Sequence, residues 1–234
     1  MHAAILGARP TRPSTARCAN ILRLSTPDAR RPLTSRSSGW ARRVAAAALQ
    51  LGLSADAISV LSLVFTALGA IALFQAPPPW NLLLLAVGIQ LRLLCNLIDG
   101  MVAVEGGRKS AFGALFNEVP DRLADSVFLV ALGYYVDMPW LGWFGALAAA
   151  VTAYIRVLGG TLGLAQDFRG PMAKPHRMAT ISVACLIAMA EYGWRGSQQA
   201  LVWAAWIVAL GGVLTCGTRL KAIARQLRDR AMTT

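Results

Sequence analysis

The stretch that decides the fold runs from Asn96 to Asp125 and reads NLIDGMVAVEGGRKSAFGALFNEVPDRLAD. It places the carboxylates of Asp99, Asp121 and Asp125 within apolar sequence. A carboxylate at membrane depth is costly unless it is paired, bound to a metal or in contact with water, so by default it marks a functional site. The stretch therefore predicts a polar site in the interior of a helical membrane protein.

The polar residues of this stretch are predicted to lie on two facing helices. Asn96 and Asp99 are three residues apart, and Asn117, Asp121 and Asp125 repeat every fourth residue, so each set lies on one helix face. The Gly-Gly pair between the two sets is typical of a tight turn. A short loop makes the helices antiparallel neighbours. We expect the two polar faces to converge near the loop, where oxygen ligands could hold a divalent cation.

The composition excludes an ordinary soluble domain. Of 234 residues, 56% are hydrophobic and 15% charged, and the mean hydropathy is +0.52. The four cysteines show no CxxC spacing, and three lie in apolar segments, so we interpret them as small hydrophobic residues without a redox or zinc role.

The apolar segments predict an all-α integral membrane protein with six transmembrane helices, each near the roughly 20 residues that a bilayer requires. Pro77-Pro78-Pro79 and Asp137-Met138-Pro139 separate neighbouring spans, and Ser54 is a candidate N-cap for the first. Together the spans are predicted to form one transmembrane domain over residues 54–220, and the polar stretch makes it the candidate catalytic domain. The expected spans are residues 55–76, 80–104, 111–136, 139–163, 177–194 and 198–219.

The ends of the chain differ from this domain in composition. Residues 1–38 are Arg-rich with one acidic residue, which predicts a disordered basic tail or residues upstream of the true start; an organellar transit peptide is the alternative. Residues 39–53 combine Trp40 and Leu49 with Arg42 and Arg43, a pattern that predicts an amphipathic helix in the membrane interface. An ordinary surface helix is the alternative. Residues 221–234 are predicted to be a basic cytoplasmic tail.

The charge distribution predicts the orientation in the membrane. The two ends and the loops at residues 105–110 and 164–176, with the adjoining Arg177, hold nineteen of the twenty-three Lys and Arg residues, whereas the opposite loops hold only Arg195. By the positive-inside rule, both termini and the polar site face the cytoplasm, or the matrix of an organelle; in a bacterium the membrane would be the inner one. The net charge of +12 is then explained by anionic lipid headgroups, with no role for nucleic acid.

Further cations are candidates for binding a substrate phosphate. Lys174 and Arg177 lie in the basic loop, and the alternative for them is contact with lipid headgroups. Arg92 and Arg156 lie within predicted spans, so we expect at least one of them to pair with a phosphate or with the acidic residues. The alternative, more so for Arg92, is a side chain that extends to the headgroups.

The stretch resembles the signature of the CDP-alcohol phosphotransferases, Asp-x2-Asp-Gly-x2-Ala-Arg-x8-Gly-x3-Asp-x3-Asp. The spacing holds without a gap over about a ninth of the chain. The matching residues are Asp99, Gly100, Ala103, Gly113 and Asp121, and the departures are Asn96 and Asn117 in place of Asp and Val104 in place of Arg. Glu105 or Glu118 could restore negative charge, and Arg108 or Lys109 could replace the missing Arg.

The resemblance implies attack by an alcohol on the phosphorus of a CDP-linked donor, with release of CMP. It implies a divalent cation, Mg²⁺ or Mn²⁺, and a possible homodimer, and leaves open whether the donor carries the lipid or the headgroup.

The implied metal ligands are Asn96, Asp99, Asn117 and Asp121. The implied CDP-binding residues are Asp99, Gly100, Ala103 and Gly113, and the implied general base is Asp121, a role that Asp125 could share. Arg156, Lys174 and Arg177 are the candidates for substrate phosphate. Because two carboxylates are replaced by amides, a catalytically weakened protein that binds CDP-lipid or a partner is the alternative.

Overall fold

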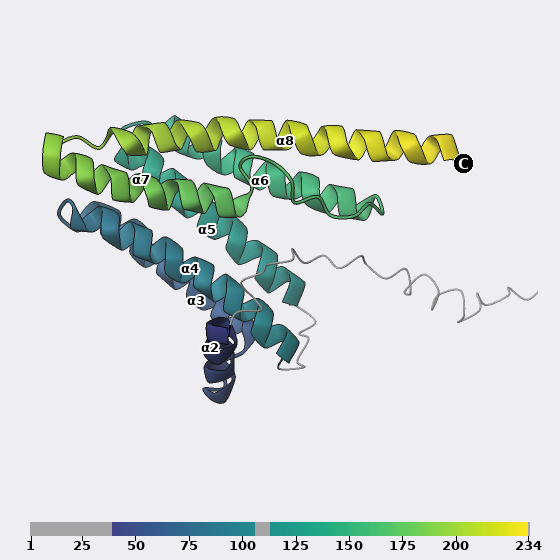
Figure 1. The fold of residues 1–234 in the computed structure, drawn as a ribbon, viewed down its shortest axis with the longest axis horizontal. Helices are drawn as coiled ribbons and strands as arrows, with labels where there is room; N and C mark the ends of the chain where they lie inside the picture. The colour runs from purple at the N-terminus through teal and green to yellow at the C-terminus, as the bar shows by residue number, and fades with distance from the viewer. Residues whose placement is uncertain (1–38, 106–112, 234) are drawn as a thin grey trace, which may run out of the picture. The chain divides into compact units, whose positions relative to one another are not determined.

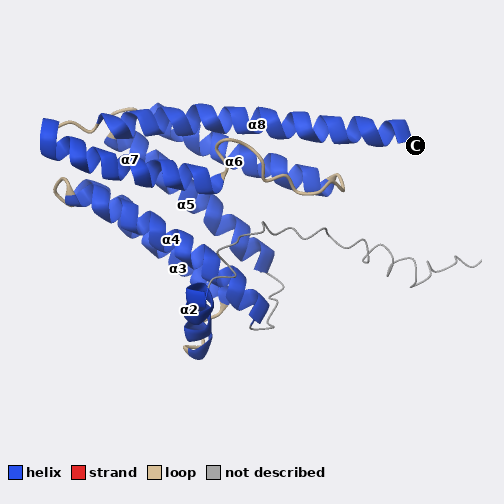
Figure 2. Cartoon of the chain, viewed as in Figure 1, coloured by secondary structure: helices blue, strands red, loops and turns tan. Residues whose placement is uncertain are grey.

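The computed structural model describes residues 39–105 and 113–233. All regular structure in these residues is helical (Figures 1 and 2). This confirms the all-α prediction for the described part of the chain. The helices are α2 (Gly39–Gln50), α3 (Ala55–Gln75), α4 (Trp80–Glu105), α5 (Gly113–Tyr135), α6 (Pro139–Thr161), α7 (Lys174–Arg195) and α8 (Gln199–Thr233).

Local sequence explains where these helices begin and end. Ser54 has an extended backbone, and its Oγ accepts a hydrogen bond of 3.1 Å from the Ala57 N–H, so it is the predicted N-cap of α3. The three prolines fall between α3 and α4. Asp137 closes α5 with a φ of 58°, and Pro139 opens α6. The sixth predicted span ends at residue 219, but α8 continues as helix to Thr233.

Within residues 39–105 and 113–233, four helices are long and apolar enough to cross a membrane: α3, α4, α6 and α8. α5 and α7 occupy the other two predicted spans but are less apolar. α5 carries four charged residues between Glu118 and Asp125, and α7 has charged residues near both ends. The structure thus supports a helical membrane protein, while the six-span count and the interfacial position of α2 stay predictions.

Each helix from α3 to α8 packs mainly against two others. α3 contacts α4 and α5, α6 contacts α5 and α8, and α7 contacts α4 and α8 (Figure 1). Glycines allow two of these crossings. A Cβ on Gly142 would lie 2.7 Å from the Leu129 carbonyl oxygen and 2.9 Å from the Gly133 Cα, and a Cβ on Gly88 would lie 3.0 Å from the Gly69 Cα. A large apolar core, including Leu82, Phe128 and Leu201, joins these helices.

The packing of α4 against α5 differs from the expectation of closely packed neighbours. Among the described residues, the close packing of α5 is with α3 and α6. Side chains of Arg92 and Asn96 on α4 reach carboxylates on α5 instead. Long polar side chains therefore occupy the space between α4 and α5. We call Arg92, Asn96, Asp121 and Asp125 the polar layer, and this layer is the candidate site.

Candidate active site

Asp121 is the centre of the polar layer. Its Oδ1 accepts hydrogen bonds from Asn96 Nδ2 at 2.6 Å and from Arg92 Nη2 at 3.2 Å. Its Oδ2 is paired with the Lys174 ammonium at the start of α7, and Arg122 Nη2 lies 3.6 Å away. The predicted convergence of the two polar faces is confirmed by the contact between Asn96 and Asp121.

Asp125, one helical turn further on, is held by two arginines. Its Oδ1 accepts from Arg92 Nη2 at 2.9 Å, and its Oδ2 accepts from Arg177 Nη2 at 2.7 Å. Asp125 is 1% exposed and Arg92 is fully buried. The prediction that an arginine inside a span pairs with the acidic residues is confirmed for Arg92, and the alternative that it extends to the headgroups is wrong.

Asp99 has a different environment. Its Oδ2 accepts a hydrogen bond of 2.7 Å from Ser59 Oγ on α3. Its Oδ1 is buried and has no hydrogen-bond partner among the described residues. A buried carboxylate oxygen without a donor is suited to a cation. Within residues 39–105 and 113–233, however, no three acidic, histidine or cysteine side chains gather closely enough to hold a metal ion by themselves. The donor set thus fits one cation at Asp99 that also uses amide or substrate oxygens.

The buried carboxylates are neutralised by the chain itself. Asp121 and Asp125 together contact Arg92, Lys174 and Arg177. A buried charge is tolerated when it is paired and hydrogen-bonded in this way. The cluster therefore requires no external cation to offset the charges of Asp121 and Asp125.

A second group of cations lies beside the acidic cluster. Arg156 of α6 contacts Glu118 Oε1 and Gln166 Oε1, each at 2.5 Å, and its guanidinium lies 5.3 Å from the Phe168 ring centre. Because Glu118 is paired with Arg156, its carboxylate is already used. This argues against the expectation that Glu118 replaces the negative charge missing at Asn117. Arg177 also donates to the Met172 carbonyl at 2.9 Å.

Arg219 belongs to this group and was missed as a site residue by sequence reasoning. It is 5% exposed and donates to the carbonyls of Arg169 at 2.9 Å and Thr152 at 2.6 Å. In the sequence it is the last residue of the sixth predicted span and was counted only with the positive charges at the C-terminal end. Its position directly after the apolar part of α8 is the signal that could have found it.

The loop between α6 and α7 sets the position of Lys174. Gly170 has a φ of +131°, and a Cβ there would lie 2.3 Å from Thr215 Cγ2. The Met172 N–H donates to Thr215 Oγ1 at 2.9 Å, which ties the loop to α8.

Burial raises the pKa of Asp167 in this loop, but hydrogen bonds from Arg169 lower it by more. The net pKa of Asp167 is therefore below its usual range.

The remaining predicted residues are less fully described. Gly100 and Ala103 are half-buried on α4, and Gly113 is the first residue of α5. Val104, in place of the signature Arg, is 61% exposed. The described part of the chain does not include the side chains of Asn117 and Glu105, nor any part of Arg108 and Lys109.

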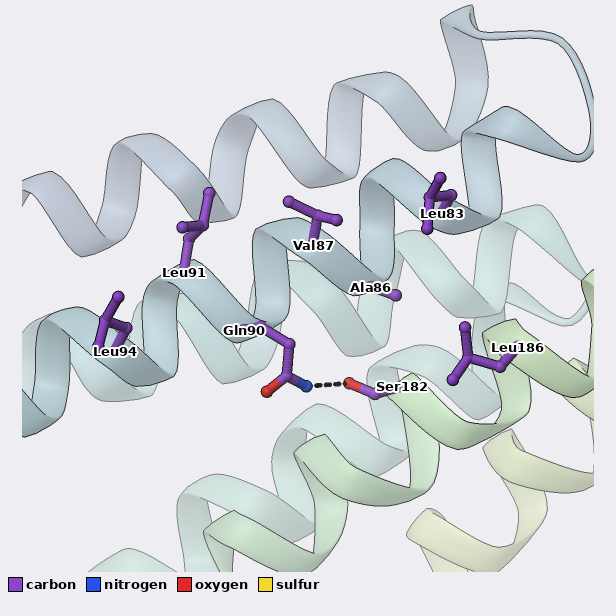
Figure 3. Close-up of a pocket in the computed structure, with 8 residues that line it drawn as sticks. All are labelled: Leu83, Ala86, Val87, Gln90, Leu91, Leu94, Ser182 and Leu186. Atoms are coloured by element: carbon purple, nitrogen blue, oxygen red, sulfur yellow. Dashed lines mark hydrogen bonds between the residues drawn. The ribbon is translucent and has the colours of Figure 1, made fainter. Parts of the chain in front are cut away.

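An apolar groove of about 420 Å³ runs between α4 and α7 (Figure 3). Its one polar contact in the figure is the hydrogen bond of 2.9 Å from Gln90 Nε2 to Ser182 Oγ. The α4 residues that line the groove include Gln90, Leu91 and Leu94, which precede and follow Arg92 in the sequence. The lining residues are Leu83, Ala86, Val87, Gln90, Leu91, Leu94, Ser182 and Leu186.

Comparison with known sequences gives consistent matches. The family model described as CDP-alcohol phosphatidyltransferase matches residues 53–211. The phosphatidylinositol phosphate synthase of Mycobacterium marinum is 27% identical over 182 residues, which is 75% of either chain. The archaetidylinositol phosphate synthase of Aeropyrum pernix is 29% identical over 136 residues, covering 55% of this chain and 67% of that protein.

Comparison with solved structures supports the fold. The phosphatidylinositol phosphate synthase of Mycobacterium tuberculosis with CDP-DAG bound has a TM-score of 0.63 and 21% sequence identity, covering 78% of this chain and 92% of that one. The same protein in complex with manganese and citrate has a TM-score of 0.63 and covers 78% of this chain and 88% of that one.

Proposed function

The chain belongs to the CDP-alcohol phosphatidyltransferase family, and we propose that it transfers a phosphatidyl group from CDP-diacylglycerol to a phosphorylated alcohol, with release of CMP. The observation that carries this proposal is the meeting of Asn96 and Asp121 next to Asp99, in the register of the signature. Phosphoryl transfer depends on positioning and on charge neutralisation, and this site brings both kinds of group together.

The proposed reaction is a single displacement at phosphorus. The acceptor hydroxyl oxygen bonds to the lipid-bearing phosphorus, the bond from that phosphorus to the oxygen of CMP breaks, and the hydroxyl proton passes to a carboxylate. We assign the proton to Asp121, because its side chain is 12% exposed whereas that of Asp125 is 2% exposed. Asp125 then positions Arg92 and Arg177.

The proposed cofactor is one divalent cation, Mg²⁺ or Mn²⁺. The resemblance implies Asn96, Asp99, Asn117 and Asp121 as ligands, and Asp99 is the one whose carboxylate keeps a buried oxygen without a described partner. The cation would supply neutralisation of the donor diphosphate charge. Gly100, Ala103 and Gly113 would leave room for the nucleotide beside it.

Two features support the proposed substrates. The groove between α4 and α7 is apolar, which suits an acyl chain of a lipid donor. Arg156, Lys174 and Arg177 each pair with an acidic residue of α5, and these cations suit a phosphate on the acceptor. The names of the relatives, phosphatidylinositol phosphate synthase above all, support an inositol phosphate as that acceptor.

The proposed setting is a multi-pass protein with α5 and α7 completing six spans. The site and both termini would face the cytoplasm, on the strength of the Lys and Arg distribution. α2 would lie in the interface, with Trp40 and Val44 exposed to the lipid and Ala41 and Ala45 packed on the protein. A homodimer is proposed on the family resemblance.

The test is CMP release by the purified protein in lipid vesicles. CDP-diacylglycerol is offered with inositol phosphate, glycerol phosphate, inositol, glycerol or serine, with and without Mg²⁺ or Mn²⁺. We expect release with a phosphorylated acceptor, its loss in Asp99→Asn, and no change in Lys221→Met, a control that removes an exposed cation of α8. Release only with an unphosphorylated acceptor would overturn the proposed acceptor class.

A second function is favoured by the two amides in the signature. Asn96 and Asn117 remove two carboxylates, and a protein that binds CDP-lipid without turnover needs fewer of them. Tight binding of CDP-diacylglycerol, with no CMP released from that donor or from CDP-headgroup donors under any cation condition, would establish this alternative and reject the transferase proposal.

A further inference from the structure

We propose that Asn96 and Lys174 together take the place of a divalent cation at Asp121. The inference refines the proposed function, since it concerns the charge that serves the same site. Its consequence is a site that binds a single divalent cation, at Asp99.

Asn96 and Asp121 are in direct contact. Asn96 Nδ2 lies 2.6 Å from Asp121 Oδ1, in a geometry where the amide donates. An aspartate at position 96 would bring two carboxylate oxygens to a similar separation, which requires a cation or a proton between them. With an amide at position 96, the two side chains form a hydrogen bond with no cation or proton between them.

Lys174 lies at an unusual position for a cation. It is the first residue of α7, whose N-cap, Ala173, has no side-chain capping hydrogen bond. The N-terminus of a helix carries partial positive charge and disfavours a cation. Lys174 nevertheless lies there, and its ammonium contacts Asp121 Oδ2. Helix electrostatics do not explain this placement, whereas pairing with the carboxylate does.

Lys174 has the bonding capacity that this role requires. An ammonium has three donors, so Lys174 can bind Asp121 and a substrate phosphate oxygen at the same time. Its side chain is 22% exposed, so the lysine is not fully enclosed by the protein. A divalent cation acts by the same bridging of carboxylate and phosphate.

Most carboxylate oxygens of the cluster already have a donor. Both oxygens of Asp121 and both of Asp125 are engaged by donors of the chain, and Asp99 Oδ2 is engaged by Ser59. Asp99 Oδ1 alone has no partner within the described part of the chain. The cluster thus offers one oxygen to one cation.

The test counts Mn²⁺ bound to the purified full chain in lipid nanodiscs, by electron paramagnetic resonance of free Mn²⁺ and by calorimetry, without substrate. We expect one Mn²⁺ per wild-type chain and two per chain of Asn96→Asp/Lys174→Met. We expect Lys174→Met alone to bind Mn²⁺ at least about tenfold more tightly, since a competing cation is removed. Arg122→Gln is the matched control, because Arg122 is a cation 3.6 Å from the same oxygen.

Two Mn²⁺ in the wild type, or one in a folded double variant, would overturn the inference. If the double variant does not fold, Lys174→Met decides, and an unchanged affinity overturns it. An equal gain in Arg122→Gln also overturns it, since the effect would then be general charge. These counts need no turnover: one Mn²⁺ without CMP release keeps this inference and rejects the proposed function, and CMP release with two Mn²⁺ does the reverse.

Discussion

Arg92 is the residue on which the buried cluster depends most. Its guanidinium is fully buried and bridges Asp121 and Asp125. Arg92→Met would leave these carboxylates short of a partner, so we expect it to destabilise the fold by about 3–5 kcal/mol. Denaturant unfolding in mixed micelles measures this. Arg122→Gln, which removes a cation that is 27% exposed, should cost less than about 1 kcal/mol. Equal stability of the Met variant and wild type would contradict this account.

Ser59 fixes the orientation of the proposed ligand Asp99. Its hydroxyl donates to Asp99 Oδ2 at 2.7 Å. Loss of such a supporting hydrogen bond lowers metal affinity by about 10-fold or more, so Ser59→Ala should weaken Mn²⁺ binding by that factor. Ser62→Ala is the control, since its hydroxyl donates only to the Ser59 carbonyl among the described contacts. Equal Mn²⁺ affinities of the two variants would show that Ser59 has no positioning role.

The sequence predicts only part of this site. The spacing of Asn96, Asp99 and Asp121 indicates the convergence of two helices, because helical periodicity is a local property. Ser59 lies 40 residues from Asp99, and a single serine in an apolar helix has no pattern that singles it out. The contact between Lys174 and Asp121 depends on how α7 approaches α5, which no local rule specifies.

At the scale of the helices, the crossing of α5 and α6 is the most restrictive contact. A Cβ on Gly142 would meet backbone atoms of Leu129 and Gly133, which cannot move as side chains do. We expect Gly142→Ala to lower the free energy of unfolding by about 1–3 kcal/mol. Gly193→Ala on α7 is the control, because nothing lies within 4 Å of its added Cβ. Thermal unfolding of both variants tests this, and equal melting temperatures would mean that the crossing tolerates a methyl group.

Most helix boundaries could be predicted because they have local causes. Ser54 caps α3, and the prolines at 77–79 interrupt the chain before α4. Two features could not be predicted. The separation of α4 and α5 depends on the long side chain of Arg92 and the residues it binds. α8 continues to Thr233, past the end of its apolar segment, so that segment does not mark the end of the helix.

For the molecule as a whole, self-neutralisation of the buried acids predicts resistance to chelators. Asp121 and Asp125 are paired with cations of the chain, so removal of metal leaves them satisfied. We expect EDTA to change the melting temperature by less than about 2 °C, which corresponds to under about 1 kcal/mol for a chain of this size. A protein whose fold needs its metal loses stability under these conditions. A large fall in melting temperature would contradict the pairing described above.

The orientation of the whole molecule is also testable. In a cysteine-free background, Ser197→Cys places a thiol between α7 and α8, and Met232→Cys places one near the end of α8. If both termini are cytoplasmic, an impermeant maleimide added to intact cells labels only position 197, and lysis exposes position 232. The opposite pattern would reverse the proposed topology.

The length of α8 has a mechanical consequence. Its 35 residues extend about 52 Å at about 1.5 Å per residue, whereas the bilayer core is about 30 Å thick. Arg230 donates to the carbonyls of Leu162 at 3.3 Å and Gly163 at 2.7 Å, which braces the distal part against the end of α6. If α8 crosses the bilayer as proposed, its excess length of about 20 Å makes it a rigid spacer that would hold a domain fused to the C-terminus away from the bilayer core.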